Sequence, residues 1–320
     1  MRETIVSLVL LFLVFSSACI GYGENRDTDN PLSHNNLTNS LLPLTDVPRG
    51  VIELGTLAKY GNITVMRATY GYVISKNGTK AFLNVSKAYF FPWGFVVVEK
   101  APALRKVPLV RANLTTIYSE SSQNTTAVVE TTRIKAYDYE GNPLWVHETQ
   151  PPYIWELIGY GKKAYEKNVS YPRILISNNS GYFFIAELPR HLGNTVNLPA
   201  SVKGISNSLY IYGSNGLLEQ FNISGRYEVD NGFLLSAGNY TVFGFQVTFE
   251  DGTPNYGEVL VFQGSKLIFR KRFERNPECL CNVIHGWARI YPDGCVLFGL
   301  LEGTGFYCKG NFKYTPKENG

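Results

Sequence analysis

The chain has 320 residues but little charge, few methionines and only one long apolar run. Charged residues make up 18% of it and the formal net charge is +4. Apart from Arg270-Lys271-Arg272 and nearby Arg275, the basic residues are scattered, so the sequence does not favour a nucleic-acid partner. No later run of 18 apolar residues predicts a membrane span, and no segment joins a 3.6-residue apolar period to helix caps. A fold built mainly from helices is therefore excluded.

Motifs of familiar enzymes are also lacking. The four histidines are His34, His147, His191 and His285, and none lies in a metal-binding H-E-x-x-H spacing. No nucleophile elbow, phosphate loop or dinucleotide fingerprint occurs. The sequence therefore predicts no catalytic residues and no cofactor. The alternative is a secreted carbohydrate hydrolase, whose paired carboxylates would come from Glu148, Glu156 and Asp293 near predicted loops.

Strand formers and turn formers dominate what is present. Aromatic residues make up 14% of the chain, with 21 Tyr, 19 Phe and 30 Gly. Asn-Gly and Asp-Gly between apolar segments predict type I′ hairpin turns, because both central residues need a positive φ. Turn dipeptides that end in Gly begin at Asn77, Glu140, Ser180, Asn215, Asn231, Asp251 and Asp293, and five of these seven are Asn-Gly or Asp-Gly. The sequence predicts an all-β protein.

One unit, Ser122–Trp145, is echoed along the chain. We expect a polar turn at residues 123–125, two short strands, a tight turn at residues 140–142, and Leu144-Trp145. Its first half recurs as Ile74–Phe82, Ile176–Ala186, Val229–Gly238 and Ile290–Gly299, at steps of 47 to 62 residues. Its second half, Ile134–Trp145, recurs as Leu209–Leu218 and Val259–Phe269. Such self-similarity indicates a repeat architecture.

These repeats resemble the PQQ-like and WD40-like β-propeller blades, with the first half as inner strands and the second half as the outer hairpin. The match is loose: strict Trp-Asp dipeptides are absent, and a docking Trp stands only at Trp145. The resemblance implies a β-propeller of about five to six blades, whose radial packing buries sheet faces. The alternative is two β-sandwich domains divided near Pro151-Pro152 or Pro199.

The N-terminal region predicts secretion. Residues 1–18 have an apolar run, Ile5–Phe15, followed by small residues, as in a signal peptide. Cys19 comes next and resembles the lipidated first residue of archaeal-type surface lipoproteins; the alternative is simple secretion. Residues 19–49 are polar and predict a tether, and residues 50–320 predict the globular part. The expected location is the outer face of the cell membrane, held by lipid.

The other four cysteines, Cys279, Cys281, Cys295 and Cys308, predict two disulfides that staple the last unit, residues 279–308. We expect Cys279 and Cys281 each to pair with Cys295 or Cys308, because the first two are too close to bridge an extended strand. A zinc site at these cysteines is the alternative. Calcium binding at the turns Asp138–Asn142 or Asp251–Glu258 is a further alternative.

Glycosylation is predicted at ten N-x-S/T sequons, which mark exposed positions in a secreted protein. They are Asn36, Asn62, Asn77, Asn84, Asn113, Asn124, Asn168, Asn178, Asn222 and Asn239.

The strongest candidate for binding is the segment Trp145–Trp155, in which Trp145, His147, Tyr153 and Trp155 surround a proline pair. Exposed aromatic side chains there would bind a glycan or a protein. The alternative is that they belong to the core, as we expect for Tyr89–Phe95. The function predicted is a binding or scaffold module at the cell surface, or an accessory subunit of a membrane complex.

Overall fold

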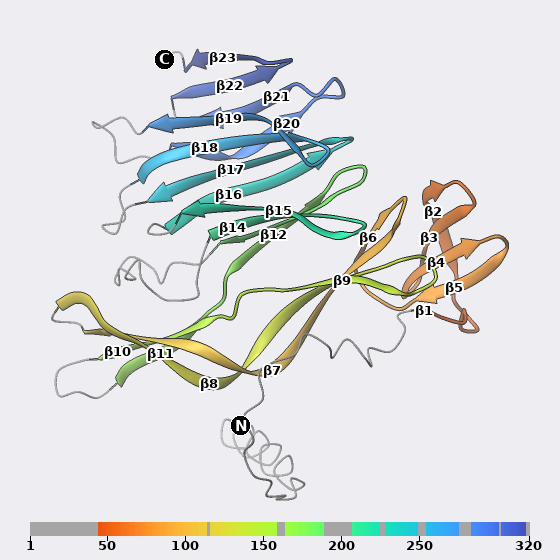
Figure 1. The fold of residues 1–320 in the computed structure, drawn as a ribbon, viewed down its shortest axis with the longest axis horizontal. Helices are drawn as coiled ribbons and strands as arrows, with labels where there is room; N and C mark the ends of the chain where they lie inside the picture. Colours follow the sequence, from red (N-terminus) through yellow and green to blue (C-terminus); the bar gives the residue numbers. More distant parts are fainter. Residues whose placement is uncertain are drawn as a thin grey trace, which may run out of the picture. The chain divides into compact units, whose positions relative to one another are not determined.

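The computed structural model describes residues 44–113, 116–158, 164–188, 207–224, 228–248, 254–274, 283–300 and 302–317. These residues form 23 strands in five sheets and no helix, which confirms the all-β prediction (Figure 1). Within these ranges no helix is long and apolar enough to cross a membrane. The chain divides into Met1–Leu41 and Leu42–Gly320, and every described residue belongs to the second unit. Signal peptide, Cys19 and Asn36 lie outside the described residues.

The first sheet has the strand order β1-β5-β4-β3-β2. Its strands are β1 (Leu44–Thr45), β2 (Glu53–Tyr60), β3 (Ile63–Ala68), β4 (Gly71–Lys76) and β5 (Thr79–Leu83). Because β1 pairs with β5 at Leu44↔Leu83, the segment predicted as tether up to residue 49 contributes a strand to this sheet.

The second sheet is the largest. It is formed by β6 (Ala88–Phe91), β7 (Gly94–Asn113), β8 (Thr116–Tyr137), β9 (Pro143–Glu148), β10 (Tyr153–Ile158) and β11 (Ala164–Ser170). Consecutive strands β6 to β9 form a four-stranded antiparallel meander, and β10 pairs in parallel with the far part of β7. Pro151-Pro152 joins β9 to β10 within this sheet, so it is not a domain boundary. Pro199 lies outside the described residues.

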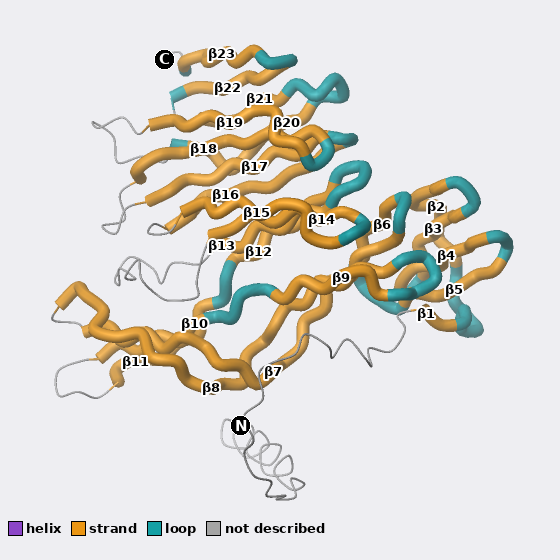
Figure 2. The backbone as a smooth tube through the Cα atoms, viewed as in Figure 1, coloured by secondary structure: helices purple, strands orange, loops and turns teal. Residues whose placement is uncertain are grey.

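The last three sheets are four-stranded antiparallel meanders, whose strands are orange in Figure 2. The third contains β12 (Arg173–Asn178), β13 (Phe183–Leu188), β14 (Asn207–Gly213) and β15 (Gly216–Ser224). The fourth contains β16 (Glu228–Ala237), β17 (Tyr240–Thr248), β18 (Pro254–Gln263) and β19 (Lys266–Glu274). The fifth contains β20 (Ile284–Ile290), β21 (Val296–Leu300), β22 (Gly303–Cys308) and β23 (Asn311–Pro316).

Turn chemistry sets several of these hairpins. Asn77 and Gly78 have φ of 51° and 83°, which confirms the predicted two-residue turn between β4 and β5. The predicted outer hairpins Leu209–Leu218 and Val259–Phe269 are β14–β15 and β18–β19.

Two predicted turns are wrong. Residues 123–125 continue β8 because β7 provides a partner at each of them, and Asn231-Gly232 is a bulge within β16.

Each sheet packs against the sheets before and after it in the chain. Val65 and Ile74 of the first sheet share a core with Phe95 of the second. Similar cores join the second sheet to the third, the third to the fourth and the fourth to the fifth. Phe91 and Phe95 are buried in these cores, so the predicted core role of Tyr89–Phe95 is confirmed. None of the core clusters formed by described residues contains side chains of both the first and the fifth sheet.

Five open sheets agree in number with the five repeat units, and none is closed on itself. The arrangement is compatible with consecutive propeller blades and also with stacked sandwich layers.

A buried amide also joins two sheets. Asn179 follows β12 and is 3% exposed. Its Nδ2 donates to Thr241 Oγ1 of β17 (3.1 Å) and to the carbonyl oxygen of Gly264 in the β18–β19 turn (2.8 Å), both within the fourth unit of the chain. Its Oδ1 accepts the backbone N–H of Tyr182 (3.2 Å). The side chain therefore fixes its own turn and holds the third sheet against the fourth.

We predict that Asn179→Ala lowers the free energy of unfolding by roughly 2 kcal/mol, because it leaves buried hydrogen-bonding groups unpaired. Urea denaturation measures this change. The matched control is Asn215→Ala in the exposed turn between β14 and β15, expected to change stability by less than about 0.5 kcal/mol. Equal effects of the two variants would show that Asn179 does not hold the sheets together.

Candidate functional site

The structure places three of the four predicted binding residues in buried positions. Trp145, His147 and Tyr153 are 8%, 7% and 2% exposed. Trp145 stacks on Tyr212 at 4.3 Å between ring centroids, and its Nε1 donates to the carbonyl oxygen of Gly213 (2.8 Å). The side chain of Trp155, in β10, lies outside the described residues. The expected exposure of the other three is wrong: Trp145 and His147 join the second sheet to the third, and Tyr153 is buried as well. A ligand-binding role for the set stays a prediction.

His147 is the centre of a buried polar network at this junction. Its Nε2 lies 2.5 Å from Glu187 Oε1, and its Nδ1 lies 2.7 Å from the Tyr212 hydroxyl. The backbone N–H of Gln150 donates to Glu187 Oε2 (3.0 Å). An ionised carboxylate can only accept, so the Nε2–H of His147 donates to Glu187, and Nδ1 forms the hydrogen bond with the Tyr212 hydroxyl. Every group in the network then has a partner.

This network has the order of a carboxylate–histidine–hydroxyl relay, but its surroundings favour a structural role. Burial raises the pKa of the Tyr212 hydroxyl, and the Tyr210 hydroxyl and the Glu187 carboxylate raise it further. Tyr212 therefore stays protonated, and it is only 6% exposed. A substrate could not reach a nucleophile here, so we assign the network to the docking of the second sheet on the third.

A different feature of the second sheet is exposed: the ladder of β7 and β8 continues far past its meander. β6 pairs with β7 only up to Val97, and β9 pairs with β8 only from Arg133 onward. We call residues 100–113 and 116–132, together with β10 and β11, the extension. Pro102 and Pro108 lie where β7 has a neighbouring strand only on its β8 side, which is the setting in which sheets tolerate proline.

The extension has its own small core and an exposed apolar pair. On one face, Val107, Leu109, Val129 and Ile154 are buried together. Leu104 and Val128 face each other across the ladder on the opposite side, and they are 69% and 70% exposed. Directly opposed apolar side chains that remain in water are a feature of interaction surfaces.

The extension also has an open strand edge. Among the described strands none pairs with β8 on the side away from β7 before Arg133. One backbone group there, the N–H of Glu130, donates to the Tyr171 hydroxyl (3.3 Å). The residues 121–129, SSQNTTAVV, contain no charge and no proline, which are the usual protections of an edge strand. Sequence reasoning missed this surface; its signal was the concentration of β-branched residues at 125–129.

Ion pairs brace the base of the extension. Arg105 of β7 and Arg133 of β8 both contact the Glu148 carboxylate of β9, with Arg133 Nε 2.7 Å from Oε1. The hydrogen bond from Arg105, together with the one from Arg133, lowers the pKa of Glu148. Glu148 therefore serves as a brace, which argues against the role predicted for it in a hydrolase.

The pKa shift predicts a pH dependence. Because folding lowers the pKa of Glu148, the unfolded chain binds its proton more readily, and the ion pairs stabilise the fold at neutral pH. This contribution is lost as the pH falls below 4.5, the ordinary value for the group. Glu148→Gln should lower stability at pH 7 and flatten the acid side of the stability curve. Denaturation as a function of pH measures both, and an unchanged slope would contradict the assignment.

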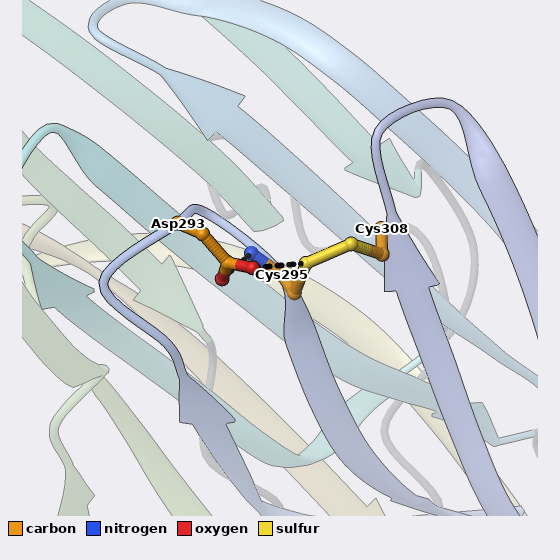
Figure 3. A group of neighbouring side chains, drawn as sticks. All are labelled: Asp293, Cys295 and Cys308. Carbon is orange, nitrogen blue, oxygen red and sulfur yellow. Dashed lines mark hydrogen bonds between the residues drawn. A yellow bond between two sulfur atoms is a disulfide. The ribbon is translucent and has the colours of Figure 1, made fainter.

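The cysteines are paired differently from our expectation. Cys295 and Cys308 form a disulfide with 4.3 Å between Cα atoms (Figure 3). They lie next to the Val296↔Tyr307 pair of β21 and β22, so the register places them opposite each other. The prediction that each would pair with Cys279 or Cys281 is wrong for this reason; those two lie outside the described residues. Asp293, Cys295 and Cys308 offer ligand atoms within 4.8 Å of one another, but the disulfide occupies both sulfurs.

Removal of this disulfide should destabilise the protein. The cysteines are 13 residues apart, and closing a loop of that size stabilises a fold by about 3 kcal/mol through the entropy of the unfolded chain. We expect Cys295→Ala/Cys308→Ala to lose roughly that amount in guanidinium denaturation without reductant. Equal stability of the variant and the native chain would refute the stapling role.

The predicted calcium turn has no free carboxylate oxygen at Asp138. Its Oδ1 accepts the backbone N–H groups of Glu140 (2.9 Å) and Asn142 (2.8 Å), and its Oδ2 accepts Asn142 Nδ2 (2.8 Å). Glu140 pairs with Lys76. The turn is therefore held by its own hydrogen bonds. Of the second candidate turn, Glu258 is buried and contacts Arg270, while Asp251 and Thr253 lie outside the described residues.

Most described sequon side chains are exposed. Asn62, Asn77, Asn84, Asn124, Asn222 and Asn239 are exposed, and Asn178 is half-buried. Asn113 and Asn168 lie in β7 and β11, with side chains outside the described set. The positions are open to modification, which itself stays a prediction.

A cavity of about 420 Å³ lies beside the first sheet. It is lined by Pro48, Arg49, Gly50, Val51, Tyr70, Phe82 and Asn84. These lining residues include no carboxylate, histidine or cysteine, so the cavity offers no acid–base pair.

No protein-family model matches this chain, and no curated protein matches it either. The proposals that follow therefore depend on its own residues.

Proposed function

We propose that this protein is a lipid-anchored glycoprotein of the outer cell surface that works as a binding or scaffold module. Cys19 after a signal-like segment supports the anchor, and the exposed sequons support the glycoprotein. The extension of the second sheet would be its binding surface for a protein partner. The observation that carries this function is the exposed pair Leu104 and Val128 on a ladder whose β8 edge is open.

The chemistry of that surface favours an extended protein segment. An open edge offers unused N–H and C=O groups, which an added strand can pair with. The exposed apolar pair would add burial on the same ladder. The bracing of the base by Glu148 would hold the surface in place, which reduces the entropy lost on binding.

We also propose that the five sheets are blades arranged around a common axis. The series of cores between consecutive sheets and the outer hairpins β14–β15 and β18–β19 support this proposal. The two-sandwich fold is the alternative, and an experimental structure of the whole chain distinguishes them.

Membrane attachment is tested by Cys19→Ser. We expect the native chain in the membrane fraction and the variant in the medium, because the lipid would be attached to that sulfur. Mass spectrometry of the N-terminal peptide identifies the attached group. Release of both proteins into the medium would contradict the anchor.

Partner binding is tested by Leu104→Ser/Val128→Ser. Partners crosslinked on intact cells should be recovered at least about tenfold less with this variant, because two apolar anchors are lost. The matched control is Leu217→Ser/Leu218→Ser, which changes an equally apolar pair on β15, each 50% exposed. Equal recovery with the native chain and both variants would show that the extension is not the binding surface.

A further inference from the structure

The fifth sheet ends the series, and its two faces have different chemistry. On one face, Ile290, Val296, Tyr307 and Phe312 lie opposite one another and join the core shared with the fourth sheet. The neighbouring row, on the other face, consists of Arg289, Leu297, Phe306 and Lys313. We call this second face the outer face. Among the described residues, no other sheet contributes to a core on it.

One tryptophan lies flat on the outer face. A Cβ added at Gly299 of β21 would come within 2.4 Å of Trp287 Nε1 and 2.6 Å of its Cε2. The indole therefore rests on the glycine backbone, a position that any larger residue would block. Trp287 is nevertheless 43% exposed. Beside it, Gly299 pairs with Thr304, which in turn pairs with Thr315, so two hydroxyl residues continue the same row.

The charged side chains on the strands of this sheet are basic, whereas the acidic residues Asp293 and Glu302 lie in its connecting turns. The four strands β20 to β23 contain His285, Arg289 and Lys313 but no aspartate or glutamate. Within the described part of the chain no carboxylate pairs with Arg289 or Lys313. The guanidinium carbon of Arg289 lies 5.0 Å from the centroid of the Tyr291 ring, within the range of a cation–π contact.

We propose that this outer face binds an acidic saccharide, one whose sugar rings carry carboxylate or sulfate groups. An indole with one face in solvent stacks on the C–H bonds of a pyranose ring, because the aromatic face is electronegative. Arg289 and Lys313 pair with the acidic groups, and the threonine hydroxyls bond to sugar hydroxyls. The inference deepens the binding role proposed above and rests on it for the biological setting. The site is separate from the extension.

Calorimetric titration of the purified full-length chain with an alginate hexasaccharide tests the proposal, with neutral maltohexaose as the comparison. We expect binding of alginate only, quenching of tryptophan fluorescence, and weakening as the ionic strength rises. Trp287→Ala should lower the affinity at least about tenfold, and Trp287→Phe should lower it less. Arg289→Gln/Lys313→Gln should reduce the affinity and most of its salt dependence.

The charge-matched control is Lys59→Gln/Lys266→Gln, which removes two exposed lysines of β2 and β19 and should bind like the native chain. Equal affinity for maltohexaose would overturn the proposal, as would unchanged binding by the Trp287 and Arg289/Lys313 variants. Binding to vesicles of anionic lipid but not to alginate would overturn it in favour of a membrane surface. The Leu104/Val128 variant should bind alginate normally, so failure here is distinguishable from failure of the protein-binding function.

Discussion

Burial of apolar sheet faces between consecutive sheets is the constraint on which this structure depends. A four-stranded sheet cannot bury its own faces, so each sheet here requires its neighbours in the chain. Val65, Phe184 and Val261 are completely buried in three different junctions of this kind. Polar groups at the same junctions, such as His147 with Glu187 and Asn179 with Thr241, are satisfied by partners and fix how neighbouring sheets dock.

The first and fifth sheets each have one face that points away from the neighbouring sheet, and these two faces differ in what covers them. On the first sheet, Val73 and Phe82 point away from the second sheet, and Val47 and Val51 of the preceding segment cover them. On the fifth sheet, the outer face carries Trp287, Leu297 and Phe306, with basic residues beside them. The covered end closes the core, whereas the uncovered end keeps aromatic surface in contact with solvent, which is why we place a ligand there.

Local chemistry predicted most of the strands and several turns, since Asn77-Gly78 can hardly adopt any other hairpin geometry. The sequence-based prediction failed where pairing between distant strands determines the structure. Asn124 and its neighbours are residue types typical of turns, but Asn124 lies opposite Pro108 in the continuous pairing of β8 with β7. The pairing of Cys295 with Cys308 follows from the β21–β22 register, which spacing alone does not reveal. Exposure is also a tertiary property: nothing near Trp145 or Trp287 in the sequence distinguishes the buried ring from the open one.

The way in which the extension joins the second sheet determines which parts of the sequence can vary in evolution. β7 leaves the meander and β8 re-enters it at positions that face each other, Glu99 and Arg133. Residues of this hairpin that neither pair with β10 nor contact Glu148 can be exchanged while the meander keeps its registers. Under the function proposed above, such exchanges would alter the binding surface without rebuilding the sheet that supports it.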